Sequence, residues 1–168
     1  GTIQSAWLHG AVAQKLKTDV ELALTAQNTQ FESYSAYEFD DPVKRYEPQN
    51  QMIYEGRLDP NGKATFSSIV KSDDASPGML NARFITRVFE QSGAFSVDRS
   101  DMPFHPYNRY IGILTPKGDK ARSMLLTDTT HTVQLVALDH EGDLIRNADV
   151  LIKLYKIKWR WWWEKGSE

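Results

Sequence analysis

Apolar and polar residues alternate with a period of two along much of this chain. In residues 19–24, Val20, Leu22 and Leu24 fall on one face of an extended strand, and acidic side chains fall on the other. This alternation predicts a strand with one buried face and one face toward solvent. Further alternating runs occupy residues 80–88, 133–137 and 150–155.

Turn-forming residues separate these runs. Asp59-Pro60-Asn61-Gly62 combines a proline that presets φ with a glycine that accepts positive φ. Glu141-Gly142-Asp143 joins two strand-like runs in the manner of a hairpin. Many short strands separated by turns predict an all-β fold, built from β-sandwich modules of the immunoglobulin or fibronectin III type.

The alternation also selects candidate core residues. In the run at 133–137 it places Val133, Leu135 and Ala137 together on one face. If the modules are structural sandwiches, we expect a set of apolar residues to form their cores: Trp7, Leu22, Leu24, Phe66, Phe84, Val88 and Leu135.

A boundary between two modules is predicted near residues 101–106, because two prolines there indicate an extended link. Residues 1–105 then form one sandwich of ordinary size. Residues 106–168 begin a second sandwich in tandem, which is too short to be complete. The chain starts without Met and contains neither a signal-type segment nor an apolar run that could span a bilayer. We therefore expect it to be a piece of a longer protein.

Composition narrows the possible partners and chemistry. The formal net charge of −2 gives no electrostatic reason to expect nucleic acid or an anionic lipid surface as a partner. The chain has no Cys, which excludes disulfides, thiol nucleophiles, Cys-ligated zinc and iron–sulfur clusters.

Candidates for catalysis or metal binding are few. The histidines lack the spacing of metal ligands, and each is expected to face solvent or cap a turn: His9, His105, His131 and His140. Three acidic clusters raise the possibility of calcium: Asp40-Asp41, Asp73-Asp74, and Asp139 with Glu141 and Asp143. The last contains only fragments of a calcium-loop pattern and is interpreted as a solvated hairpin turn, and Asp73-Asp74 is interpreted as an exposed loop. Motifs for a nucleophile elbow or a phosphate-binding loop are missing from the sequence. We expect no enzymatic activity, no metal and no cofactor.

The most unusual feature is a cluster of tryptophans in the last ten residues. On an extended strand Trp159, Trp161 and Trp163 share one face, and Trp162 lies on the other. They could form an exposed platform that stacks on sugar rings or on a peptide. Burial in a core or against a neighbouring module is favoured, because aromatic side chains gain most of their stabilisation from buried area. These tryptophans are the candidate interaction surface.

Five stretches of the chain, taken together, indicate a family resemblance. They are the opening Trp7–Ala11, residues 31–42, the glycine-turn hairpin Leu58–Phe66, residues 106–113 and the Trp-rich string Lys156–Glu164. Over nearly the whole chain they resemble the bacterial α2-macroglobulins. The Trp-rich string and the Trp-Leu-His-Gly opening are the specific parts, since glycine-turn hairpins occur in many β proteins.

The resemblance implies a string of fibronectin-like sandwiches in a large periplasmic protein that is often lipid-anchored. Such proteins present a bait segment to proteases and close on them, and many use a thioester built from Cys and Gln. This chain cannot contain the thioester, because it has no Cys.

By this resemblance the chain supplies non-catalytic scaffold modules of a protease-trapping inhibitor of the periplasm or cell envelope. Its partners would be neighbouring modules and, through the full-length protein, proteases, with no contact to nucleic acid or to the membrane. Polar module interfaces would let the modules reorient. Two alternatives stay open: a carbohydrate-binding module that uses the Trp-rich strand, and an edge strand that docks another cell-envelope protein.

Overall fold

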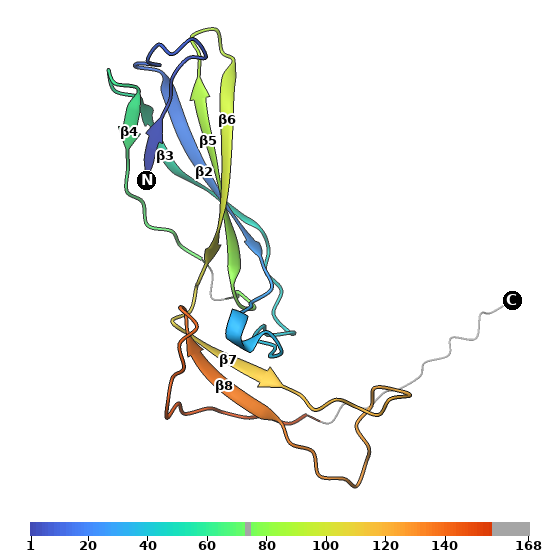
Figure 1. Cartoon of the computed structure of the whole chain (residues 1–168). Helices are drawn as coiled ribbons and strands as arrows, with labels where there is room; N and C mark the ends of the chain where they lie inside the picture. The colour runs from blue at the N-terminus through green and yellow to red at the C-terminus, as the bar shows by residue number, and fades with distance from the viewer. Residues whose placement is uncertain (73–74, 156–168) are drawn as a thin grey trace, which may run out of the picture.

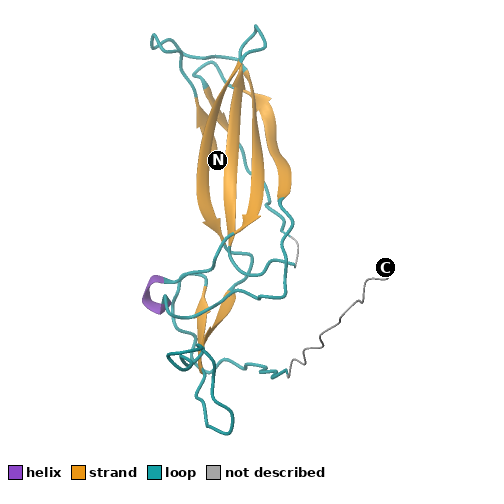
Figure 2. Ribbon diagram, turned by 90° about the vertical axis from the view of Figure 1, so that its right-hand side faces the viewer, coloured by secondary structure: helices purple, strands orange, loops and turns teal. Residues whose placement is uncertain are grey.

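The computed structural model describes residues 1–72 and 75–155, and these form three antiparallel sheets with no α-helix among them (Figures 1 and 2). The all-β class is therefore confirmed. The elements in chain order are β1 (Thr2–Gln4), β2 (Lys17–Ala26), the 3-10 turn η1 (Glu32–Tyr34), β3 (Gln49–Arg57), β4 (Lys63–Thr65), β5 (Leu80–Phe89), β6 (Phe95–Phe104), β7 (Arg109–Leu114) and β8 (Gln134–Asp139).

The largest sheet has the strand order β3-β2-β5-β6, with β2 pairing along its full length with β5. The short pair β1-β4 packs on one face of this sheet. Ile3 of β1 and Ala64 of β4 are buried in one cluster with Val20 of β2. These two layers make the sandwich of the first part of the chain, and β7-β8 is a separate sheet at its end (Figure 1).

The alternation predicted for β2 is confirmed. Val20, Leu22 and Leu24 are at most 2% exposed, and all three face the sandwich interior. The opposite face carries charge, where the Arg87 guanidinium lies 2.7 Å from Asp19 and 3.2 Å from Glu21. Asp19 is only 6% exposed, so this ion pair offsets the cost of burying a carboxylate on the outer face.

Most of the predicted core residues are in the core, and two are not. Leu22 and Leu24 are buried, and Phe66, Phe84 and Val88 are half-buried against the core clusters. Trp7 and Leu135, by contrast, are 37% and 38% exposed.

Trp7 was predicted wrongly because it begins a tight turn. Its carbonyl accepts a hydrogen bond from Gly10 at 2.8 Å, and its N–H donates to Ala11 at 2.8 Å. Gly10 adopts a φ of +86° to close this turn. The indole lines an open groove with Val12 and Leu16 and stays partly exposed.

The turn at residues 59–62 forms as predicted. Gly62 has a φ of +73° and donates its N–H to the Asp59 carbonyl at 3.0 Å. The Asp59 carboxylate accepts further hydrogen bonds from the N–H groups of Asn61 and Lys63, both at 2.8 Å. The turn carries the chain from β3 across to β4 in the other layer.

Two predicted segments have a different conformation. Residues 101–104, expected in the link, continue β6, so only residues 105–108 connect the sheets. Pro103 is tolerated because β6 is an edge strand with one side unpaired. The strand expected at residues 150–155 does not form, since no described segment pairs with it. The division into modules at residues 105 and 106, with the second incomplete, stays a prediction.

Among the described residues, the structure has no helix long and apolar enough to cross a membrane.

We predict that Leu22→Ala lowers the free energy of unfolding by about 2–5 kcal/mol, because it leaves a cavity at a fully buried position. Leu8→Ala is the matched control, since Leu8 is fully exposed in the turn after Trp7 and should change stability by less than about 0.5 kcal/mol. Urea denaturation followed by far-UV circular dichroism measures both. Equal losses for the two variants would contradict the assignment of the core.

Candidate functional site

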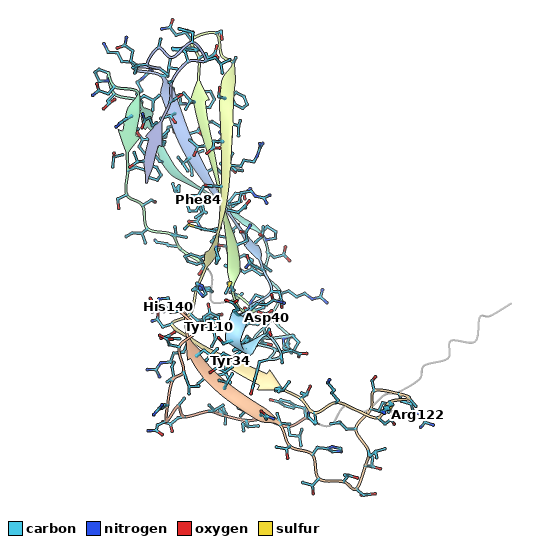
Figure 3. All side chains as sticks on the ribbon, in the orientation of Figure 1. Tyr34, Asp40, Phe84, Tyr110, Arg122 and His140 are labelled. Atoms are coloured by element: carbon cyan, nitrogen blue, oxygen red, sulfur yellow. The ribbon has the colours of Figure 1, made fainter. Side chains whose placement is uncertain are left out.

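The sandwich and the β7-β8 sheet meet at a cluster of apolar side chains, which we call the aromatic junction (Figure 3). The first part of the chain contributes the loop at residues 27–41, which includes η1 and lies between the large sheet and β7 in Figure 1. The second part contributes one face of β7-β8. The buried members are Phe31, Phe39, Tyr110, Val136 and Leu138, and Tyr34, Tyr37 and Tyr107 pack around them.

The rings of the junction meet edge to face. The Phe31 and Phe39 centroids are 4.9 Å apart with an interplanar angle of 68°. Phe31 and Tyr110 are 5.5 Å apart at 64°. Edge-to-face pairs at this spacing contribute about 0.5–1.5 kcal/mol each beyond their buried area. The three rings therefore fix the loop against β7.

The backbone reinforces this packing. The Glu38 N–H donates to the Ile113 carbonyl at 2.9 Å, and the Ile113 N–H donates back to Glu38 at 2.9 Å. The loop thus adds a one-residue antiparallel bridge to β7. A Cβ at Gly112 would lie 2.5 Å from Phe39 Cε1 and 2.9 Å from Val136 Cγ1. A glycine at this position lets the Phe39 ring lie directly on the strand.

A polar clamp closes the base of the loop. The Thr29 N–H donates to both Asp40 carboxylate oxygens at 3.2 and 3.1 Å, and the Thr29 hydroxyl donates to Oδ1. The same hydroxyl accepts the Met79 N–H at 2.6 Å. A Cβ at Gly78 would collide with both Asp40 and Thr29. Asp40 therefore holds the loop in shape, a role that the sequence did not indicate.

Tyrosines tie the link between the sheets to the first part of the chain. The Tyr107 hydroxyl donates to the Ser76 carbonyl at 2.6 Å and accepts a hydrogen bond from the Lys44 ammonium at 3.2 Å.

Burial raises the pKa of Tyr110 to about 12, so its hydroxyl is uncharged at neutral pH.

Comparison with known proteins identifies the two parts of the chain. Residues 1–106 match the family described as the bacterial alpha-2-macroglobulin MG5 domain, and residues 112–168 match bacterial macroglobulin domain 6. The chain belongs to the bacterial α2-macroglobulin family. The resemblance found in the sequence is confirmed.

One solved structure supports the fold of these macroglobulin modules. Escherichia coli alpha-2-macroglobulin activated by porcine elastase is similar with a TM-score of 0.55 at 19% sequence identity. The match covers 84% of this chain and 12% of that chain, so the present chain spans a small share of the E. coli protein's length. A search of curated proteins gave no match.

The contact between the two macroglobulin modules differs from the expected polar interface. Its centre consists of buried aromatic and aliphatic side chains, with hydrogen bonds at its margin. The sequence contains an indication of this apolar contact, because residues 31–39 include four aromatic residues without strand periodicity. Such a density of aromatics outside a strand indicates a loop that is buried against something.

The β7-β8 sheet of the second macroglobulin module is apolar on both faces. Tyr110, Val136 and Leu138 point into the junction, while Ile111, Ile113 and Leu135 on the other face are 37–43% exposed. The expected inward direction of Leu135 was wrong for this reason. Alternation specifies a buried face only when the other face is polar.

The candidate interaction surface of Trp159, Trp161, Trp162 and Trp163 lies outside the described residues, as does Asp73-Asp74. Their predicted roles stay predictions.

The histidines fall into two groups. His9, His131 and His140 are exposed, as expected, and His131 Nε2 lies 2.8 Å from the Leu126 carbonyl oxygen. His105 is half-buried in the link between the modules, and its ring centroid lies 6.1 Å from that of His140. The expectation that each histidine faces solvent or caps a turn was therefore wrong for His105.

The acidic cluster after β8 forms a hairpin turn. Carboxylate oxygens of Asp139, Glu141 and Asp143 lie within 4.8 Å of one another. Asp139 Oδ1 accepts the N–H groups of Glu141 and Asp143, both at 2.9 Å. The hydrogen bond from Asp143, the largest cause, lowers the pKa of Asp139. These bonds explain why the carboxylates converge.

We predict that Thr29→Val lowers the free energy of unfolding by about 1–3 kcal/mol, because the buried Met79 N–H loses its acceptor while the shape of the side chain is kept. Thr129→Val is the matched control, since Thr129 is exposed and its hydroxyl reaches only the nearby Thr127 carbonyl. Urea denaturation of both variants tests the clamp. A loss for Thr29→Val no larger than that of the control would show that the clamp does not stabilise the loop.

Proposed function

We propose that this chain is a non-catalytic scaffold of a bacterial α2-macroglobulin-like inhibitor that traps proteases, and that its two modules act in it as one rigid unit. The aromatic junction is the observation that supports a rigid unit. The family membership of both modules and the elastase-activated state of the similar E. coli protein support the inhibitor.

The energetics of the junction favour coupled motion of the modules. Burying one Phe side chain contributes about 1.5–3 kcal/mol, and Phe31 and Phe39 are each 8% exposed in the same cluster. Contacts between domains of one chain are usually more polar, and relative motion is expected when they are small. A buried aromatic contact, reinforced by a backbone bridge, transmits a displacement of one module to the other.

Two polar side chains at the junction have structural partners. Asp40 is held by Thr29, and Tyr107 is held by Ser76. Their hydrogen bonds support a scaffold role for these two side chains, and we propose a scaffold without catalytic residues, metal or cofactor. Its partners would be the neighbouring modules of the same protein and, through the whole inhibitor, proteases. Its place would be the periplasm or the cell envelope, without contact to nucleic acid or to the membrane.

The function is tested in the full-length inhibitor with Phe39→Ala. We predict that this variant is still cleaved by elastase but retains several-fold less protease, because losing a buried Phe removes about 3–5 kcal/mol from the junction. Retained protease is measured by gel filtration followed by quantification of elastase in the inhibitor fraction. Phe95→Ala is the matched control, since Phe95 is 53% exposed on the edge strand β6 and should leave retention unchanged.

Two results would contradict the proposal at different steps. If the full-length inhibitor without substitutions is cleaved but retains no elastase, the trapping function is ruled out. Retention by Phe39→Ala equal to that of Phe95→Ala would leave trapping in place and rule out the need for a rigid junction.

A further inference from the structure

One titratable ring of the junction has no use in the packing described above. His105 is the first residue of the link at 105–108 and follows directly on β6. Its ring centroid lies 5.7 Å from that of Tyr110, 6.5 Å from that of Phe31 and 6.1 Å from that of His140. Figure 3 shows Tyr110 and His140 together at this place, where the two modules meet.

The surroundings suit a neutral imidazole. His105 Nδ1 is buried and has no hydrogen-bond partner among the residues that the structure describes. A proton on the ring would place a positive charge in a half-buried site and beside a second imidazole. It would also leave both ring N–H groups to be satisfied in a site that offers Nδ1 no acceptor.

The charged and titratable groups around His105 do not compensate such a charge. On the β7 side these are the hydroxyls of Tyr107 and Tyr110, and the loop at 27–41 contributes Asp40, which is held by Thr29. The turn after β8 contributes His140, followed by acidic groups whose nearest member is bound to its own backbone: Asp139, Glu141 and Asp143. No described carboxylate forms an ion pair with His105.

We propose that the junction is a pH-responsive hinge, in which a proton on His105 releases the loop at 27–41 from β7-β8 and frees the two modules to move apart. This inference does not depend on the proposed protease trap, because it concerns only the contact between the modules.

The direction of the pH effect follows from the site. Burial and the neighbouring His140 lower the pKa of His105 below its usual 6.5 while the modules are docked. The undocked state therefore binds more protons between the docked pKa and 6.5. Docking is fully stable well above pH 6.5, weakens as the pH falls through 6.5, and weakens no further below the docked pKa.

The hinge is tested by measuring the distance between the modules. Because the chain has no Cys, the pair Ser96→Cys and Thr132→Cys gives two specific labels, one on β6 and one just before β8. Fluorescence transfer between the labels is recorded from pH 8 to pH 5. We expect one narrow distance distribution at pH 8 and a shifted, broader distribution at pH 5, with a midpoint below pH 6.5.

Variants of the same labelled chain show which group carries the effect. His105→Phe keeps an aromatic ring that cannot be protonated and should keep the narrow distance distribution at both pH values. His140→Gln should move the midpoint downward and shrink the change, because it removes a repulsion that disfavours the proton on docked His105. His9→Gln is the matched control at an exposed, distant histidine and should behave as the natural sequence does.

The hinge is overturned if the distance in the natural sequence is the same at pH 8 and pH 5. It is also overturned if His105→Phe keeps the same transition, or if the far-UV circular dichroism of the sheets is lost together with the distance change. Should His105→Phe be undocked already at pH 8, His105→Gln takes its place, and a pH-dependent distance in that variant would overturn the proposal.

Discussion

The structure depends on the packing of Phe31 and Phe39 against β7. These rings come from a loop of the first module, and without them the short β7-β8 sheet would have no partner layer among the described residues. Two isolated strands are marginal in water, so the second sheet gains its stability from the first module. The clamp between Thr29 and Asp40 prepares the loop for this contact.

Steric room at two glycines makes the arrangement possible. Gly112 lets a ring lie on β7, and Gly78 leaves space for the clamp at the base of the loop. The hydrogen bonds of the clamp hold the base of the loop at 27–41, and aromatic packing holds the same loop against β7. Among the described residues, Ile111 and Leu135 on the outer face of β7-β8 are partly exposed. In this arrangement the sheet is both an outer wall of the second module and the docking surface of the first.

The sequence predicts the first sandwich well and the junction poorly, for a physical reason. In β2, one face is apolar and the other is acidic, so the alternation identifies the buried face of Val20, Leu22 and Leu24. In β8 both faces are apolar, so the alternation does not indicate which face is buried against the first module. The position of His105 depends on contacts with residues far away in sequence, which spacing alone cannot show.

Hydrogen exchange of two backbone amides tests whether the two modules are docked through the loop at 27–41. The amides of Glu38 and Ile113 bond only across the junction, each to the carbonyl of the other. If the modules are docked, both amides exchange slowly at pH 8 and at similar rates, like those inside β7-β8. Exchange of both at the rates of an exposed loop, with the β2-β5 amides still protected, would show that the modules are independent and would contradict the account.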